Sequence, residues 1–192
     1  MIIFAASQKF NNLKMKKTHL LLFFMLFLIL PAKAQLYVGG GLNYFTTNAS
    51  NLDTDIKYFS IAPELGYSFS RVSLGLVFEY AHASDEYSPY STTSSLSFTP
   101  YFRPHNLEVG PLCFFVDVLF SFTRLSQYNY HKQSYLVGLR PGLSYHLTDK
   151  FFAVVNFGVA GYSSDADSYG FDGWGVSLSM TTTKLGFYYK FW

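Results

Sequence analysis

The chain has 192 residues, a formal net charge of +2 and 20% aromatic residues, with 16 Tyr and 21 Phe. Five of the 14 basic residues fall within residues 1–34, so residues 35–192 carry nine basic against 12 acidic side chains, a formal charge of −3. This balance gives no electrostatic basis for binding nucleic acid. The single cysteine, Cys113, excludes a disulfide framework or a cysteine-based metal site within the chain.

Residues 15–34, MKKTHLLLFFMLFLILPAKA, have the pattern of a secretory signal peptide. Two lysines precede the unbroken apolar run 20–30, and alanines occupy the −3 and −1 positions of a cleavage site after residue 34. This apolar run is shorter than the roughly 20 residues that a membrane-spanning helix needs. We therefore predict a signal peptide over 1–34, with Met15 as the true start, and one domain over 35–192 that is exported through the inner membrane.

Apolar residues alternate with small or polar residues through the whole predicted domain, which is typical of β-strands with two different faces. The pattern predicts eight strands near residues 36–45, 57–69, 72–81, 95–103, 112–124, 134–146, 151–162 and 182–192. Most of these segments are longer than the usual globular strand of about 5–6 residues. They match the roughly 9–11 residues with which a tilted strand crosses a membrane.

The composition of the two faces indicates which one meets lipid. In the third strand Val72, Leu74 and Leu76 alternate with Ser73 and Gly75, and the other strands repeat this contrast. A soluble barrel would need charged residues over its outer face, whereas here the less apolar face holds Gly, Ser, Ala and isolated charges. That face suits the narrow interior of an eight-stranded barrel. We therefore predict an all-β fold, an eight-stranded antiparallel up-and-down transmembrane β-barrel with its apolar face in lipid.

Six charged residues in the middle of strands share the inward parity. They are Glu64, Glu79, Arg103, Asp117, Arg140 and Lys190. Buried charges persist in proteins when they are paired, so three acidic and three basic side chains on one face predict a structural polar network that fills the lumen. A proton or ion relay is the functional alternative.

The connections between strands are mostly long and polar in alternate positions, as in outer-membrane barrels with short periplasmic turns and longer outer loops. An even number of strands then places both termini at the periplasmic end. The apolar parity changes within residues 180–184. A bulge in one long final strand explains this change, and a ninth strand is the alternative.

Taken together, these segments resemble the outer-membrane protein β-barrel domain family, small barrels common in Bacteroidetes. The resemblance covers residues 35–192 and is carried by VGGGLNY, FSIAPELGYSFS, LRPGLSYHLTDKFFAVVNFGVAGYSS and VSLSMTTTKLGFYYKF. It implies an integral outer-membrane protein without a catalytic motif. It also implies that the aromatic C-terminal strand is the signal read by the barrel-assembly machinery, with Phe187, Tyr189, Phe191 and Trp192 as its residues. Trp192 departs from the family pattern, in which the chain stops at the position of Phe191.

The sequence contains no strong catalytic or metal-binding motif. His82 and Ser84 are followed by two acidic residues, but neighbours in sequence rarely converge on one point as a catalytic triad requires. We expect no catalytic residue, cofactor or metal site. The sequence therefore predicts an outer-membrane barrel with a side-chain-filled lumen and a structural or surface-interaction role through polar loops, whose partners are outer-membrane lipid and an extracellular ligand. A narrow pore for small solutes or ions is the alternative, and an enzyme at the barrel rim is the second alternative.

Overall fold

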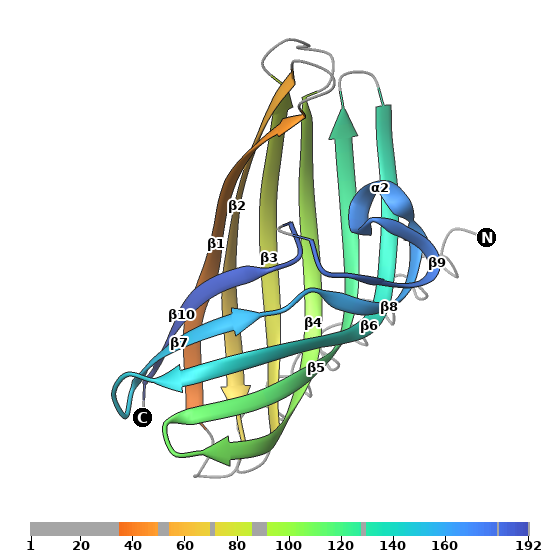
Figure 1. Cartoon of the computed structure of the whole chain (residues 1–192). Helices are drawn as coiled ribbons and strands as arrows, with labels where there is room; N and C mark the ends of the chain where they lie inside the picture. The colour runs from red at the N-terminus through yellow and green to blue at the C-terminus, as the bar shows by residue number, and fades with distance from the viewer. Residues whose placement is uncertain are drawn as a thin grey trace, which may run out of the picture. The chain divides into compact units, whose positions relative to one another are not determined.

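The computed structural model describes residues 35–49, 54–69, 72–85, 92–127, 130–179 and 181–191. The predicted signal peptide and Trp192 lie outside these residues. The strands are β1 (Gln35–Ala49), β2 (Thr54–Ser68), β3 (Val72–Asp85), β4 (Thr93–Val109), β5 (Leu112–Gln127), β6 (Tyr130–His146), β7 (Phe151–Asn156), β8 (Val159–Asp165), β9 (Phe171–Ser177) and β10 (Lys184–Lys190), and one short helix, α2 (Ala166–Tyr169), joins β8 to β9 (Figure 1).

These strands form a closed antiparallel barrel. Pairing runs in chain order from β1 to β7, then from β7 to β10, and β10 returns to β1. β7 and β8 together make the seventh strand of the ring, and β9 and β10 together make the eighth. The ring therefore has eight strands. The prediction of an eight-stranded antiparallel barrel is therefore confirmed. Among the described residues, no helix has the length and hydrophobicity of a membrane-spanning helix.

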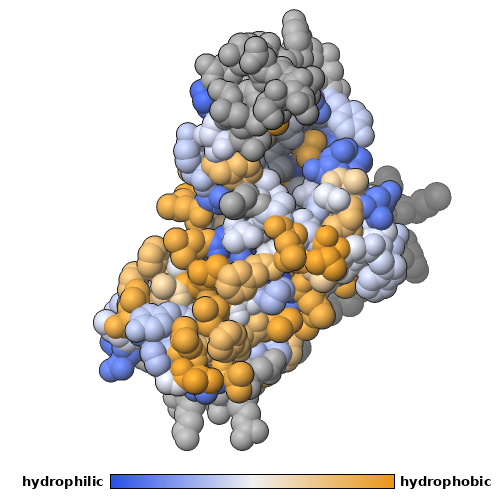
Figure 2. Space-filling view, in the orientation of Figure 1, coloured by the Kyte–Doolittle hydropathy of each residue, from blue (hydrophilic) through white to orange (hydrophobic). Residues whose placement is uncertain are grey.

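The alternation of faces follows the predicted parity. In β5 nearly every second side chain is buried, and the intervening Phe114, Val118, Phe120 and Phe122 are 40–46% exposed. Apolar side chains cover much of the face seen in Figure 2, which has the orientation of Figure 1. Because exposed apolar area of this extent is costly in water, the outer surface is suited to lipid.

The strands are longer than the alternation of apolar residues predicts. β5 and β6, for example, stay paired as far as Gln127 and Tyr130, inside a segment expected to be a loop. At this end of the barrel the outward side chains become polar, so the apolar signal stops while the backbone pairing continues. We call this end the loop end, and the opposite end, with the short connections such as Gly110–Pro111 and Leu147–Lys150, the turn end.

The seventh and eighth strands are interrupted at the same level. Between β7 and β8, Gly158 adopts a φ of +69°, a left-handed conformation that glycine adopts readily. Between β9 and β10, the N–H groups of Thr182 and Thr183 donate to the carbonyl of Ser179 at 3.1 and 3.0 Å, which makes a turn. The parity change predicted near residues 180–184 is thus an interruption over Leu178–Thr183 rather than a simple bulge, and it adds no ninth strand to the ring.

Glycines of the inner face make room for aromatic rings. A Cβ on Gly75 would overlap the ring of Tyr101, and a Cβ on Gly66 would overlap the ring of Tyr37. Both tyrosines are buried, with about 4% of each exposed. A ring from one strand covers a glycine on a neighbouring strand, so the narrow lumen is filled without steric conflict.

We predict that Gly75→Ala destabilises the barrel by about 1–3 kcal/mol, the usual range for overpacking a filled interior. The Tyr101 ring would have to move, and its hydroxyl is held by Glu64. Urea unfolding in phosphatidylcholine vesicles measures the change. Gly41→Ala is the matched control, because a Cβ there meets no atom closer than 3.4 Å. Equal unfolding midpoints for the two variants would contradict the prediction.

Candidate functional site

The lumen is divided into three levels along the barrel. A small pocket of about 80 Å³ lies at the turn end, a polar network lies above it, and a cavity of about 780 Å³ lies at the loop end. Each level is built from inward-facing residues of several strands. Passage of a solute from one end of the lumen to the other therefore depends on what the middle level allows.

Asp117 on β5 is the centre of the polar network. Its side chain is fully buried, and it accepts hydrogen bonds from two arginines on the neighbouring strands. Arg103 Nε and Nη2 donate to the carboxylate at 2.6 and 3.1 Å, and Arg140 Nε and Nη2 donate at 3.1 and 2.8 Å. Both guanidinium groups are almost completely buried. Paired charge-assisted hydrogen bonds of this kind combine strength with a fixed geometry.

Glu64 and three tyrosines extend the network across the lumen. The Glu64 carboxylate accepts from the hydroxyl of Tyr101 and, at 2.7 Å, from that of Tyr188, and it lies 3.8 Å from Arg103 Nη2. The hydroxyl of Tyr37 is hydrogen-bonded to that of Tyr101. Two carboxylates and two guanidinium groups balance in charge, so this group is a neutral plug. We refer to Glu64, Arg103, Asp117, Arg140, Tyr37, Tyr101 and Tyr188 as the polar plug.

The structure brings together four of the six charged residues expected in one network. Glu79 lies apart from the polar plug and pairs with Lys184, the first residue of β10. Lys190 lies at the turn end, where its Nζ is 4.3 Å from the centre of the Phe152 ring. Lys184 shares the parity of Lys190 and could have been found from the sequence, but it fell in the segment assigned to the parity change.

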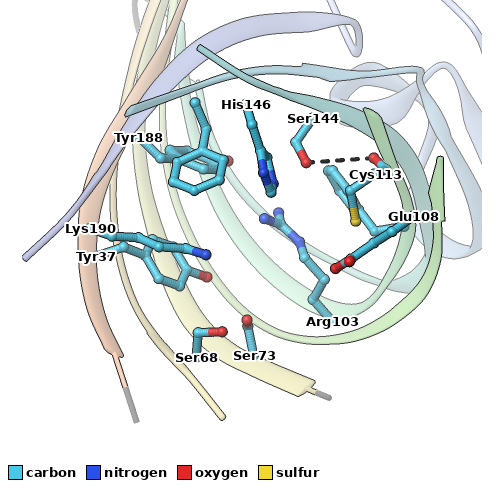
Figure 3. Close-up of a pocket in the computed structure, with 12 residues that line it drawn as sticks. Tyr37, Ser68, Ser73, Arg103, Glu108, Cys113, Ser144, His146, Tyr188 and Lys190 are labelled. Carbon is cyan, nitrogen blue, oxygen red and sulfur yellow. Dashed lines mark hydrogen bonds between the residues drawn. The ribbon is translucent and has the colours of Figure 1, made fainter. Parts of the chain in front are cut away.

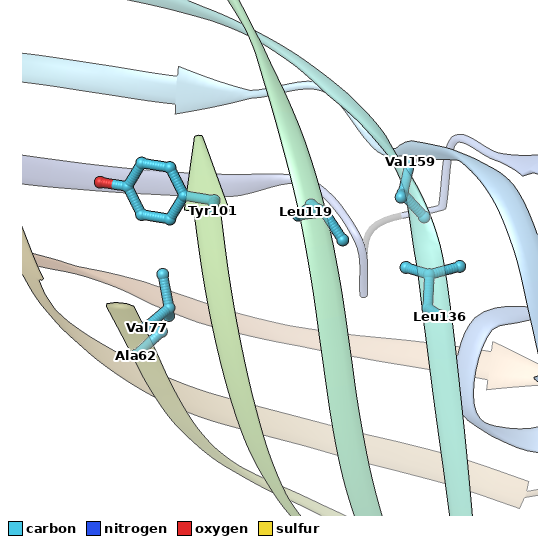
Figure 4. Close-up of a cluster of buried hydrophobic side chains, with 6 residues drawn as sticks. All are labelled: Ala62, Val77, Tyr101, Leu119, Leu136 and Val159. Carbon is cyan, nitrogen blue, oxygen red and sulfur yellow. The ribbon is translucent and has the colours of Figure 1, made fainter. Parts of the chain in front are cut away.

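An apolar layer of inward side chains lies alongside the polar plug. Figure 4 shows this cluster. It consists of Ala62, Val77, Tyr101, Leu119, Leu136 and Val159, with Tyr169 and Phe171 packed against it. Tyr101 belongs to both groups, since its ring packs in the cluster while its hydroxyl reaches Glu64. The lumen is therefore closed at this level by side chains that fit against each other.

The loop-end cavity has a wall of hydroxyl groups on β4 and β5. Ser97 is hydrogen-bonded to Thr123 at 2.7 Å, and Thr99 to Ser121 at the same distance. Thr123 also bonds the hydroxyl of Tyr169 on α2 at 2.7 Å. These hydroxyl groups have hydrogen-bond partners within the protein, so they do not need a ligand or water to satisfy them.

The helix α2 covers one side of this cavity. Lys132 Nζ contacts the carboxylates of Asp165 and, at 3.0 Å, Asp167, and Ser134 donates to Ser168 at 2.7 Å. The neighbouring outward residues on β6 are polar and exposed, so this ion pair lies beyond the apolar band. The contacts fix α2 on the inner side of β6, where sequence reasoning predicted only a loop.

The turn-end pocket gathers several reactive side chains but is small. Figure 3 shows Glu108 from β4, Cys113 from β5 and His146 from β6 around it, together with Arg103. A volume of about 80 Å³ holds a few water molecules at most. Among the residues that the structure describes, no group of three or more His, Cys, Asp or Glu is arranged to hold a metal ion.

The remaining candidates lie on the outer face. His82 Nδ1 is 3.0 Å from Ser94 Oγ across the β3–β4 pair, so the described contacts of His82 do not join it to Ser84. Phe187, Tyr189 and Phe191 are 40–48% exposed, and the rings of Phe187 and Phe151 stack. These three residues are the described part of the predicted insertion signal, whose role stays a prediction.

We predict that Asp117→Ala lowers the free energy of unfolding by about 3–5 kcal/mol, because it leaves two buried guanidinium groups without their partner. Asp172→Ala on β9 is the control, since Asp172 is exposed and a surface substitution usually changes stability by less than about 0.5 kcal/mol. Urea unfolding in vesicles compares the two variants. A small effect at Asp117 would show that the polar plug contributes little to the fold.

The attachment of α2 should depend on pH. Burial alone would raise the pKa of Asp165, but hydrogen bonds from Lys132 and Ser168 outweigh it and hold this pKa below its usual value. The carboxylate therefore contributes stability above pH about 4, where it is ionised even in the unfolded chain, and the contribution is lost as the pH falls through the folded-state pKa.

We expect amide hydrogen exchange of α2, corrected for intrinsic rates, to be faster at pH 2.5 than at pH 7 as a result. In Lys132→Met, which removes the ion-pair partner, the difference between the two pH values should shrink. Protection of α2 that is independent of pH in the wild-type protein would show that other contacts hold the helix.

Comparison with known proteins bears on the barrel fold and the family. The protein of known structure called Neisserial surface protein A (NspA) matches over 83% of this chain and 98% of its own, with 13% identity and a TM-score of 0.50. A loop-deletion mutant of OmpT, an outer membrane protein of Vibrio cholerae, matches over 84% of this chain and 50% of its own, with 10% identity and a TM-score of 0.40. No curated protein matches the sequence significantly. The family model described as "Outer membrane protein beta-barrel domain" matches residues 20–191, so the chain belongs to this outer-membrane β-barrel family.

Proposed function

We propose that the protein is an integral outer-membrane barrel that does not conduct and acts at the cell surface through its loop end. The observation that carries this proposal is the polar plug. Asp117, with two arginines bound to it, lies across a lumen that eight strands already make narrow. Opening a path would require breaking buried charge pairs, and removing one partner of such a pair typically costs several kcal/mol.

The proposal sets the orientation of the barrel in the membrane. A cleaved signal peptide over 1–34 would deliver the chain through the inner membrane, and the barrel-assembly machinery would insert it by reading Phe187, Tyr189, Phe191 and Trp192. The turn end would then face the periplasm and the loop end the exterior, since outer-membrane barrels have short periplasmic turns. Outer-membrane lipid surrounds the apolar face in this arrangement.

The loop end supplies the surface for interaction. Its strands extend past the apolar band with Ser, Thr and Tyr side chains, and α2 adds a fixed element at the rim. Tyrosine and serine side chains combine contact area with adaptable hydrogen bonding, which suits recognition of an extracellular ligand or partner. A catalytic role is not proposed, because the described contacts of His82 do not join it to Ser84, as a triad of these residues would need.

Planar-bilayer recording tests the plug. We expect the purified barrel to give no steady conductance, because the polar plug blocks the path between the turn-end pocket and the loop-end cavity. The double variant Asp117→Ala/Arg140→Ala removes the centre of the plug and should give measurable current if it folds, which migration on an unboiled detergent gel establishes. Steady conductance of the wild-type barrel would contradict the proposal and favour the narrow pore.

A further inference from the structure

The barrel is closed over only part of its height. β10 pairs with β1 from Tyr37 to Leu42, whereas β2 pairs with β1 on its other side up to Ala49. Among the described strands, none pairs with β1 beyond Leu42 on the β10 side, and β9 pairs with β8 alone. In Figure 1 the chain between β9 and β10 leaves the edge of β1. Asn43 Nδ2 still donates to the Thr183 carbonyl at 3.0 Å. We call the gap between residues 44–49 of β1 and β9 the seam.

The seam begins at a depth where lipid surrounds the barrel. Six paired residues of β1 span about 20 Å along a strand, and less along the axis of a tilted barrel, whereas the apolar band of such barrels is about 25 Å tall. An open sheet edge is not stable in direct contact with hydrocarbon and occurs at this depth only where it lines a cavity or is buried in protein. The edge of β1 at the seam must therefore line a cavity or be covered by another molecule.

The apolar residues beside the seam are unusually exposed. Trp174, Val176 and Leu178 on the β9 side are 83%, 67% and 75% exposed, and Tyr44 on β1 is 69% exposed. Outward apolar residues that are paired on both sides are less exposed, at 46% for Val118, 60% for Leu96 and 62% for Leu42. These residues lie along the two edges of the gap, where one strand neighbour is missing, and we call the two groups the apolar lips of the seam.

The loop-end cavity lies directly behind these lips. Phe45 on β1 lines it from one side of the seam, and Val176 and Leu178 line it from the other, so the cavity and the seam are continuous. Its volume of about 780 Å³ falls in the range of about 300–1,000 Å³ that is usual for ligand sites. At its lower end lies the Lys184–Glu79 ion pair, which neutralises both charges.

The lining favours an apolar chain over an ion or a sugar. Apolar side chains are distributed around the cavity, and they include Phe45, Ile56, Leu119, Leu125, Leu136, Val159, Val176 and Leu178. The lining also contains polar side chains. The hydroxyls of Ser97, Thr99 and Thr123 have partners within the protein, so an alkyl chain can lie beside them without breaking their hydrogen bonds. The charged groups of Glu79, Lys184 and Arg140 are likewise paired within the protein. Polar groups of α2, such as Asp167 and Ser168, line another part of the cavity and could meet the polar head of an amphiphile.

We propose that the loop-end cavity binds the acyl chain of a membrane amphiphile, which enters sideways from the bilayer through the seam between β1 and β9. This inference rests on the proposed outer-membrane location but not on the polar plug. An acyl chain fills both the gap and the cavity behind it. A strand from a second copy of the protein would cover the edge of β1 and leave the cavity unoccupied.

Photolabelling in phosphatidylcholine vesicles tests the proposal. The folded barrel is irradiated with two probes in separate arms, palmitate with a diazirine in its chain and a phosphatidylcholine with the same group in one acyl chain. Adducts are mapped by mass spectrometry on neighbouring residues of opposite faces, Ser97 and Thr123 inside against Phe98 and Phe122 outside. We expect adducts on both faces in both arms, because the phospholipid chain reaches the inside only through the seam.

A matched pair of variants controls for the site. Ser95→Trp fills the cavity and should reduce inside adducts at least fivefold, while Leu96→Trp, the next residue on the outer face, should change them less than twofold. Adducts confined to outside residues in both arms would overturn the proposal, as would a cross-linked dimer through Tyr44 and Val176 with an unlabelled interior. If palmitate labels the inside residues and the phospholipid probe does not, the proposed entry from the bilayer through the seam is wrong. The conductance measurement is independent of the labelling. Steady current together with labelled inside residues would contradict the proposal of a non-conducting barrel and would still support the acyl-chain site.

Discussion

The fold depends on one constraint, which is that backbone groups in a bilayer have no water to bond with and must pair with each other. A barrel meets this constraint when its last strand returns to its first. Here the return uses the glycine run of β1, where Gly39 lies opposite Tyr188 and Gly41 opposite Gly186. A Cβ at Gly39 would overlap the Tyr188 ring and would lie 2.5 Å from the carbonyl of Phe187. Closure therefore requires a residue without a side chain at position 39.

The same closure determines the chemistry of the lumen. Eight strands bring the inner faces so close that side chains from opposite walls touch. Charged groups in this space cannot keep their hydration, so they persist only as partners of each other. Asp117 between Arg103 and Arg140, with Glu64 held by Tyr101 and Tyr188, satisfies this requirement in a neutral group. The aromatic rings add packing around the guanidinium of Arg103, which lies 3.9 Å from the centre of the Phe115 ring.

Much of the fold could be predicted from the sequence because period-two alternation reports which way each side chain points. It identified the lipid face, the eight-stranded ring and the inward direction of residues such as Arg103 and Asp117. Alternation does not report height along the barrel, which depends on the stagger between strands. For this reason it could not show that Glu79 pairs with Lys184, or that Tyr101 reaches Glu64 from a neighbouring part of the sheet. The helix α2 was missed because a four-residue helix has no periodic signal.

The interruptions of the seventh and eighth strands explain how one closed sheet can also hold a large cavity. Two residues separate β7 from β8, whereas six separate β9 from β10, so the pairing registers of the two halves differ by four residues. The extra residues of the eighth strand turn at Ser179 and take β9 away from β1. Below this point the lumen is narrow and filled by the polar plug, and above it the sheet opens. The parity change in the sequence near residues 180–184 marks this point, so an irregularity in the pattern locates the boundary between the closed barrel and its seam.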